Sequence, residues 1–577
     1  MIRLKRYFKY VKPHLIFFII GPIMMLTEVA GDVVMPKLVS LIINKGVYNA
    51  DSSYIIRTGV LMVLAAFVMM LAGVLGNYFA ARASISFAAD LRADLFKKVQ
   101  EFSFKNIDKF STGSLITRLT NDITQMQNVM RMALVMLLRS PGMLIGAFIM
   151  AVTINAKLAL VIAVVTPLLA FGIFFIMKKA LPRFNIMQKK LDTLNSGIQE
   201  NLTNIRVVKS FVRTDFEKEK FTAANDDLMD NSLKAMYIMV YTMPLMMFMM
   251  NLTTIAVMWF GGKFVISGGM AVGDLTAFTT YIVQILMSLM MLSMIILQGS
   301  RALASSRRIS EVLDEKVDLT DDEAENKEAV VTDGRIEFKN VFFRYTGKND
   351  VLEDISFTVS PGQTVGILGA TGSGKTSLVQ LIPRLYDATE GEILVDGVNV
   401  KDYSLKNLRE GVGMVLQKNV LFSGTIMENL LWGDENASDE EVYKCSEHAQ
   451  AHGFITATDE GYDRELGQGG VNVSGGQKQR ICIARALLKK PKILILDDST
   501  SAVDTATEAK IRESFSTDLK DTTKVIIAQR ISSVMEADKI IVLEEGRIIG
   551  MGTHSELMAE SEEYRDIYYS QKDKEEA

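Results

Sequence analysis

Cysteine and histidine are both scarce in this sequence. The 577 residues include two cysteines, Cys445 and Cys482, which support neither a disulfide framework nor a zinc site. The four histidines are scattered and form no group that could bind a metal ion, so an ordinary surface or core role is expected for each. An excess of positive charge is also lacking, because the formal net charge is −4. We therefore expect no nucleic-acid partner.

Hydrophobic residues are abundant beside a high content of charge. They make up 49% of the chain, 23% of the residues are charged, and the mean hydropathy is +0.20. A chain of this length is expected to form more than one domain, and the composition predicts a membrane half and a charged soluble half. The basic residues 1–12 run into an apolar stretch without a small-residue cleavage site, so no cleavable signal peptide is expected.

Six apolar runs in the first half are long enough to cross a bilayer. They predict an all-α transmembrane domain over residues 1–310, in the lipid bilayer of the cytoplasmic membrane. Lysine and arginine gather before the first run and in the long connections after the second and fourth, so both termini are predicted to be cytoplasmic. The six runs are His14–Val34, Gly59–Ala80, Ala133–Thr153, Leu158–Met177, Ala235–Phe260 and Leu275–Leu297.

Two of the predicted spanning helices continue as polar helices into the cytoplasm. The segments Ser84–Phe102 and Ala180–Phe211 contain few helix breakers and are predicted to be two long cytoplasmic helical extensions. Two short segments, Gly113–Leu119 and Arg213–Phe221, are suited to cross the ends of these helices. This pattern is typical of levers that contact a partner domain. A solvated helical hairpin is the alternative.

The predicted spans hold a few ionisable residues and many methionines. Glu28, Asp32 and Arg139 lie within apolar runs, and charges at bilayer depth usually face a cavity. For Glu28 and Asp32 an interfacial position is the alternative. The methionines fit either an adaptable pocket for apolar ligands or ordinary helix packing. In the fifth and sixth spans they are Met236, Met239, Met243, Met246, Met247, Met249, Met250, Met258, Met287, Met290, Met291 and Met294.

The pattern changes from long apolar runs to short β runs in the second half. Residues 311–333 belong to a charged stretch and are predicted to be a linker. Residues 334–577 are predicted to form an α/β nucleotide-binding domain, with a P-loop between a strand and a helix. The predicted strands before and after that loop are Ile336–Phe338, Val341–Tyr345, Ile355–Val359, Thr364–Leu368 and Glu392–Val395.

The phosphate-binding loop has the pattern G-x-x-x-x-G-K-T. Its backbone N–H groups can surround the phosphates of ATP, Lys375 can reach the β- and γ-phosphate oxygens, and the Thr376 hydroxyl can bind Mg²⁺. The predicted ATP-binding residues of this segment are Gly369, Thr371, Gly372, Ser373, Gly374, Lys375, Thr376 and Ser377.

A second segment, Val473–Asp504, adds two more kinds of nucleotide contact. A turn of small and amide residues starts a helix, where free N–H groups and the helix dipole favour phosphate. A strand of four apolar residues, Ile493–Leu496, then ends in Asp497 and Asp498, and a carboxylate in that position suits Mg²⁺. The residues of the turn are Ser474, Gly475, Gly476 and Gln477.

Three further side chains lie at the end of a predicted strand or just after one. Tyr345 could stack on a nucleotide base, and Gln417 could join Thr376 and Asp497 around Mg²⁺. A buried strand over Thr523–Ala528 ends at Gln529.

Together, these motifs resemble those of a half-transporter of the ATP-binding cassette (ABC) exporter family. The resemblance covers nearly the whole chain, from the six spans to the turn Ser501–Asp504, with the motifs in the family's order. It implies a dimer in which each ATP lies between the phosphate loop of one chain and the signature turn of the other, with Asp504 among the nucleotide contacts. It also implies that Gly113–Leu119 and Arg213–Phe221 couple the two halves.

The departures from the family pattern concern hydrolysis. Asp498 stands where the family has a glutamate that polarises the attacking water, and Gln529 replaces the switch histidine. The shorter side chain retracts the carboxylate by about 1 Å, which can cost on the order of 10²-fold in rate, and glutamine cannot carry a proton as histidine does.

The resemblance therefore implies the degenerate-site subunit of a heterodimeric bacterial exporter of amphipathic compounds. Asp498 and Gln529 would form a slow site, and the intact signature would complete the competent site of a second half-transporter. A homodimer with slow, Asp498-dependent hydrolysis is one alternative. An ATP-gated channel or regulatory membrane protein is another, disfavoured because the sequence has no regulatory insertion.

Overall fold

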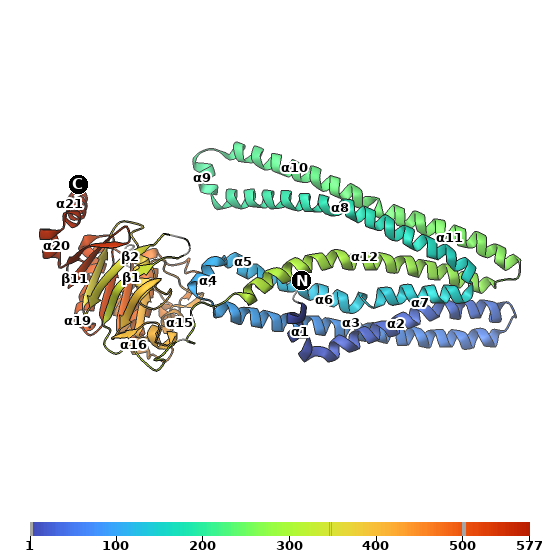
Figure 1. Cartoon of the computed structure of the whole chain (residues 1–577), viewed down its shortest axis with the longest axis horizontal. Coiled ribbons are helices and arrows are strands. Elements are labelled where there is room, and N and C mark those ends of the chain that lie inside the picture. The colour runs from blue at the N-terminus through green and yellow to red at the C-terminus, as the bar shows by residue number, and fades with distance from the viewer. Residues whose placement is uncertain (1–3, 323, 346, 348, 499–502, 577) are drawn as a thin grey trace. The chain divides into compact units, whose positions relative to one another are not determined.

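The computed structural model describes residues 4–322, 324–345, 347, 349–498 and 503–576 (Figure 1). Ser501 and Ala502 of the predicted turn lie outside this description, as does the side chain of Met294. The chain forms two compact units. The helical unit comprises residues 1–100 and 112–314, and the α/β unit comprises residues 101–111 and 315–577.

Long helices make up the helical unit, because its runs of leucine, methionine, alanine and phenylalanine favour helix and are apolar on all sides. The longest, α3 (Ser52–Gln100), has 49 residues and therefore extends about 74 Å at 1.5 Å per residue. The other helices are α1 (Leu4–Val11), α2 (Leu15–Leu41), α5 (Thr112–Thr117), α6 (Ile123–Met136), α7 (Arg139–Ile154), α8 (Ala156–Thr203), α9 (Ile205–Ser210), α10 (Thr214–Val240), α11 (Thr242–Ile266) and α12 (Val272–Asp314).

Six of the described helical segments are long and apolar enough to cross a membrane, which confirms the predicted number of spans. α3 and α8 are much longer than the roughly 30 Å of a bilayer core, so the predicted polar continuations are helical as far as Gln100 and Thr203. The six segments are Arg6–Val47, Ser52–Gln100, Thr112–Ile154, Ala156–Thr203, Thr214–Ile266 and Val272–Leu292.

Small residues let α2 and α3 approach each other closely. A Cβ atom on Gly21 of α2 would lie 3.4 Å from the Ala80 nitrogen and 3.6 Å from the Gly76 oxygen of α3. Ala80 and Gly76 are both buried. Such small-residue contacts are a common way for membrane helices to associate, because lipid supplies no hydrophobic force between them.

The predicted positions of the two short transverse segments are wrong. The short helix at the end of α8 is α9, and Arg213–Phe221 lies at the start of the long helix α10. Asn204 has a non-helical backbone and ends α8. Val212 has a left-handed backbone with φ of 53°, so the long helix α10 begins only after that residue. Gly113–Leu119 likewise falls within α5 and the start of the π-helix η3 (Arg118–Asp122).

A separate short helix, α4 (Phe104–Lys109), belongs to the α/β unit. Ser103 starts it with a reciprocal capping box, in which Asn106 Oδ1 accepts from the Ser103 backbone at 3.2 Å. Asn106 also donates to the Lys316 carbonyl at 3.0 Å.

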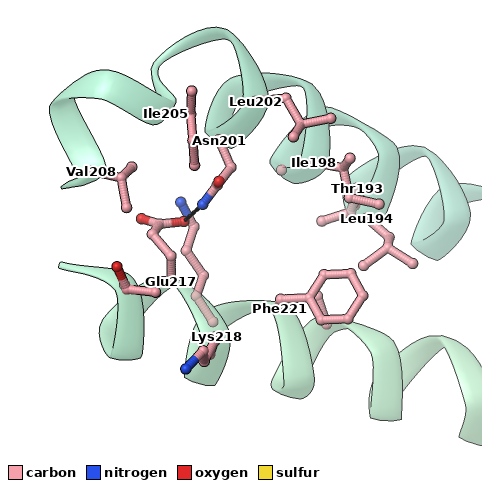
Figure 2. A pocket seen from close by; sticks show the side chains of 14 residues that line it. Thr193, Leu194, Ile198, Asn201, Leu202, Ile205, Val208, Glu217, Lys218 and Phe221 are labelled. Carbon is pink, nitrogen blue, oxygen red and sulfur yellow. Dashed lines mark hydrogen bonds between the residues drawn. The ribbon is translucent and has the colours of Figure 1, made fainter.

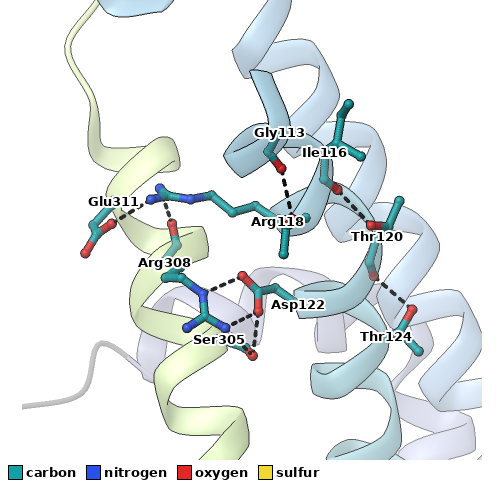
Figure 3. Close-up of polar contacts among 10 residues, drawn as sticks. Gly113, Ile116, Arg118, Thr120, Asp122, Thr124, Ser305, Arg308 and Glu311 are labelled. Atoms are coloured by element: carbon teal, nitrogen blue, oxygen red, sulfur yellow. Dashed lines mark hydrogen bonds and ion pairs between the residues drawn. The ribbon is translucent and has the colours of Figure 1, made fainter. Parts of the chain in front are cut away.

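A buried polar network joins η3 to α12 (Figure 3). Asp122 is 2% exposed and accepts hydrogen bonds from Arg308 Nε at 2.7 Å and Ser305 Oγ at 2.8 Å. Arg118 donates to the Arg308 carbonyl at 2.8 Å and to Glu311 Oε2 at 3.1 Å. Asp122 is buried and the Arg118 side chain is only 10% exposed, and both bind to α12, so this network fixes the register of η3 against α12.

The α/β unit contains a mixed six-stranded sheet in the order β12-β11-β3-β10-β9-β6. β9 (Ile493–Asp497) and β10 (Thr523–Ile527) are buried at every position, as parallel strands covered on both faces are expected to be. Only β12 pairs antiparallel within this sheet as described. The other strands of the sheet are β3 (Thr364–Leu368), β6 (Val412–Val415), β11 (Lys539–Glu544) and β12 (Arg547–Gly552).

An antiparallel four-stranded sheet, in the order β2-β1-β4-β5, and the short pair β7-β8 complete the strands. β1 joins the two predicted strands Ile336–Phe338 and Val341–Tyr345 into one, with register shifts between them, and it ends at Phe343, before Tyr345. The strands are β1 (Ile336–Phe343), β2 (Leu352–Val359), β4 (Glu390–Val395), β5 (Val398–Asn399), β7 (Gly424–Thr425) and β8 (Glu465–Leu466).

The helices of the α/β unit are mostly short. Besides α4, they are α13 (Lys375–Gln380), α14 (Leu405–Gly411), α15 (Ile426–Leu431), α16 (Asp439–His448), α17 (His452–Thr456), α18 (Gly475–Leu488), α19 (Thr505–Asp518), α20 (His554–Glu560) and α21 (Glu562–Glu576).

Candidate functional site

One pocket of about 320 Å³ brings together predicted residues from four separate segments of the chain. It lies where β3 and β9 end, so the phosphate loop and the paired carboxylates share it. Gln417 and Gln529 come from the ends of two further segments. The pocket is lined by Val351, Thr371, Gly372, Gly374, Lys375, Thr376, Ser377, Gln417, Asp497, Asp498, Ile527 and Gln529.

The phosphate loop depends on glycine at three points after β3. Gly369, Gly372 and Gly374 have φ of +152°, +89° and +96°, in the region that favours glycine. A Cβ on Gly369 would lie 2.2 Å from the Leu543 carbonyl oxygen, so a side chain does not fit. Lys375 Nζ donates to the carbonyls of Gly369 at 2.9 Å and Ala370 at 2.8 Å, and burial lowers the pKa of its ammonium group.

Asp497 is the last residue of β9 and is 1% exposed. It accepts a hydrogen bond from Thr376 Oγ1 at 3.1 Å. Burial raises the pKa of this carboxyl group, and the neighbouring charge of Asp498 adds to the rise. A buried carboxylate that is costly to ionise, beside a hydroxyl and the Gln417 amide, offers the hard oxygen ligands that Mg²⁺ prefers. These residues therefore fit the predicted ion together with nucleotide phosphates.

Asp498 and Gln529 form a direct pair in the same pocket. Gln529 Nε2 donates to Asp498 Oδ2 at 2.8 Å, and Gln479 Nε2 donates to the Asp498 backbone carbonyl at 3.2 Å. The backbone of Asp498 is left-handed, with φ of 48°. The two departures from the family pattern are thus in contact, and Gln479 is a neighbour that the sequence reasoning missed.

Tyr345 lies beside the pocket. Its hydroxyl group is 2.8 Å from Ser377 Oγ, and burial raises its pKa. Its ring meets Tyr386 edge-on, with ring centroids 5.0 Å apart. Tyr386, which the sequence reasoning did not single out, donates to Asp108 Oδ2 of α4 at 2.7 Å and lies 6.1 Å from the Phe104 ring. Two tyrosines therefore connect the phosphate-loop helix with α4.

The predicted signature turn forms a capped helix start. Ser474 caps α18 by accepting from the Gln477 backbone at 3.3 Å, and Gln477 Oε1 accepts in return from the Ser474 backbone at 3.0 Å. Asp504 similarly caps α19 by accepting from the Thr507 backbone at 2.9 Å. In the described part of the chain, Ser474, Gly475, Gly476, Gln477, Asp504, Gly369 and Ser373 are not among the residues that line the pocket.

A second hollow, of about 510 Å³, lies in the helical unit between the end of α8 and the start of α10 (Figure 2). Phe221 of α10 lies across from Leu194 and Ile198 of α8, and most of the lining is apolar. Just beyond α9, Phe211 and Val212 are 74% and 85% exposed. This end of the hairpin therefore carries apolar surface outside the bilayer-spanning part of the chain.

Comparison with known proteins gives two family matches. The family described as "ABC transporter transmembrane region" matches residues 18–289, and the family described as "ABC transporter" matches residues 352–501.

Similar proteins match along the whole chain. The ABC transporter ATP-binding protein YfiB of Bacillus subtilis (strain 168) is 43% identical over 97% of each chain. The putative multidrug export ATP-binding/permease protein YgaD of the same organism is 33% identical over 98% of each chain. A solved bacterial Atm1-family ABC exporter with ATP bound is 25% identical, with a TM-score of 0.79 over 98% of this chain and 99% of that chain.

Proposed function

Because this chain belongs to the ABC transporter family, as an exporter half-transporter with a membrane region and an ATPase domain in one polypeptide, we propose that it forms one half of a heterodimer and holds the slower of two ATP sites. ATP drives export across a membrane in this family. The observation that carries the finer proposal is the contact between Asp498 and Gln529 in the pocket of the phosphate loop.

The contact explains why hydrolysis at this site would be slow. The Asp498 carboxylate is one methylene shorter than glutamate, and the Gln529 amide donates to it at 2.8 Å. An amide cannot relay a proton, and a carboxylate displaced by about 1 Å from its working position can lose on the order of 10²-fold in rate. Lys375, Thr376 and Asp497 lie in the same pocket, which supports retained nucleotide binding.

The signature turn supports a division of labour between two chains. Ser474 and Gln477 keep the reciprocal cap that orients the first turn of α18. They would contact ATP held by a partner's phosphate loop, and the partner would supply the water-activating group. ATP would hold the soluble domains together, and hydrolysis at the partner's site would reset the transporter.

Two elements would transmit the association and release of the soluble domains to the membrane. α4 contacts Tyr386 through Asp108 and Phe104 within the α/β unit. The exposed apolar end of the α8–α10 hairpin would contact the partner's ATPase domain (Figure 2). Both would lie on the cytoplasmic side, where the basic connections also place the two termini.

An amphipathic or hydrophobic compound is the proposed cargo. The apolar, methionine-containing spans support this class, and so does the multidrug-export name of the relative YgaD. A homodimer with slow hydrolysis at Asp498 is the second candidate, since Asp498 keeps the carboxylate in the pocket.

The purified chain alone, in lipid nanodiscs, tests the proposal. We expect it to bind Mg²⁺-ATP, measured with a fluorescent ATP analogue, and to hydrolyse it at no more than about one hundredth of an ordinary exporter's rate. Lys375→Ala is the control that should abolish binding, because it removes the phosphate-binding ammonium group. Hydrolysis by the unpartnered chain at ordinary exporter speed would show that two copies of this chain suffice without a slow site, and it would overturn the proposal.

A further inference from the structure

Three charged side chains meet inside the membrane-spanning part of the helical unit. Arg139 of α7 lies 2.9 Å from Glu28 Oε1 and 3.6 Å from Asp32 Oδ2, both on α2. These side chains are only 27%, 17% and 26% exposed. The group therefore holds one positive charge against two carboxylates.

An unbalanced carboxylate is costly at this depth, because hydrocarbon cannot solvate it. Within the described residues, Glu28 Oε2 is buried and accepts no hydrogen bond. Gln284 of α12 reaches the same part of α2, where its Nε2 donates to the Asp32 carbonyl at 2.9 Å, and its own Oε1 also has no donor there. Two acceptor oxygens are thus left without a donor in the described part of the chain, and the one on Glu28 is complementary to a positively charged ligand.

Glu28 also lines a hollow of about 670 Å³ against α3. The other side chains there include Ala66, Met69, Met70 and Val74, which are apolar and, in the methionines, flexible and polarizable. Asn77 is the other polar side chain of the lining, and its Nδ2 donates to the Gly73 carbonyl. A hollow with mainly apolar walls and one carboxylate fits a bulky organic cation, whose apolar groups contact the walls while its charge meets the acid.

Glycine at position 73 gives the carboxylate its place against α3. A Cβ on Gly73 would lie 3.2 Å from Glu28 Cδ and Oε2, closer than most Cβ contacts allow. A methyl group there would displace the carboxylate from its present position by a few tenths of an ångström. Gly59, on the same helix, has open space around it and would tolerate a methyl group.

We infer that Glu28, assisted by Asp32, binds the positive charge of a cationic amphipathic compound in the hollow between α2 and α3. This inference rests on the proposed export function and names the class of its cargo. Arg139 holds the two carboxylates together, so that one of them is left to meet the ligand.

Binding of two ions of equal shape and opposite charge tests the inference. The full chain, in nanodiscs, is titrated with tetraphenylphosphonium and with tetraphenylborate. We expect Glu28→Gln, which keeps the side-chain shape, to weaken tetraphenylphosphonium binding about tenfold or more and leave tetraphenylborate binding no weaker. Gly73→Ala should also weaken binding of the cation. Gly59→Ala is the matched control and should leave that binding unchanged.

Equal effects of Glu28→Gln on both ions would show a structural role and contradict the inference. No effect on the binding of either ion, or no binding of the cation to the unaltered chain, would contradict it too. Binding of Mg²⁺-ATP to the same samples separates the two proposals. If it is intact while the cation result fails, the cargo class is wrong and the proposed function stands.

Discussion

Asp497 and Asp498 are neighbours in the chain with different surroundings. Asp497 is buried at the end of β9 and meets Thr376, whereas Asp498 turns through a left-handed backbone to meet Gln529. The first environment suits a metal ligand, and in the proposed function the second would determine how a water molecule is activated. The direction of the chain at Asp498 would therefore separate the binding role from the hydrolytic role.

Replacement of Asp497 should stabilise the nucleotide-free protein. Because burial raises its pKa, the folded chain holds the Asp497 proton more tightly than the unfolded chain, and stability falls as the pH rises from the ordinary carboxyl range toward the folded-state pKa. Above that pKa the buried charge is a cost. Asp497→Asn removes it and should raise the melting temperature at pH 8 by about 2–4 °C, the shift expected from about 1 kcal/mol.

Thermal unfolding at pH 5 and pH 8, with and without Mg²⁺-ATP, checks this prediction. The rise in melting temperature caused by Asp497→Asn should be smaller at pH 5. The extra stabilisation by Mg²⁺-ATP should largely disappear in this variant. Asp459→Asn, at an exposed carboxylate, is the control and should change little. A lower melting temperature for nucleotide-free Asp497→Asn at pH 8 would contradict the prediction.

Motif spacing predicted much of the pocket at the residue scale. The phosphate loop, the carboxylate pair and Gln529 follow strands, and parallel strands bring their carboxyl ends to one edge of a sheet, so these residues meet. Tyr386 and Gln479 could not be predicted in this way. Their contacts depend on how α4 and α18 pack, and no local pattern specifies that packing.

Hydrogen bonds between charged and polar side chains connect η3 to α12 in the helical unit. Asp122 is buried, and its oxygens accept from Arg308 and Ser305 (Figure 3). Removing the arginine leaves that carboxylate without its closest cation. This is costly, because a buried charge that loses its partner also loses the compensation for its desolvation.

Arg308→Ala should therefore destabilise the helical unit. We expect a loss of about 2–3 kcal/mol, less than the 3–5 kcal/mol typical of fully buried pairs, because the Arg308 side chain is 46% exposed. Arg307→Ala changes an exposed neighbour on the same helix and should have little effect. Thermal or denaturant unfolding of the two variants in detergent measures this loss. If Arg308→Ala is as stable as Arg307→Ala, the network does not contribute to stability and the prediction is wrong.

Apolar run length predicted the long helices, and it did not predict the short ones. Six spans and their polar continuations follow from composition, whereas the ends of α8 and α3 were placed too late in the sequence. The missing signals were local. Ser103 and Asn106 form a capping box that starts α4, and Asn204 interrupts the helix before α9. The ion pairs of Arg139 with Glu28 and Asp32 could not be predicted either, because they depend on which faces of α2 and α7 meet.

At the scale of the whole molecule, the proposed asymmetry requires two different chains. This chain's pocket would bind ATP, and its α18 start would serve a different pocket, so the two motifs contribute to different sites. Variants of the two motifs should therefore have unequal effects on the assembled transporter.

ATPase activity of this chain co-purified with its partner half-transporter, in nanodiscs, tests this asymmetry most directly. The two variants compared are Ser474→Ala, at the signature, and Asp498→Asn, at this chain's own pocket. We predict that Ser474→Ala lowers activity by tenfold or more, on the order of the loss for one contact to a reacting phosphate, and that Asp498→Asn lowers it by less than about twofold. Equal losses in the two variants would show two equivalent sites and contradict the account.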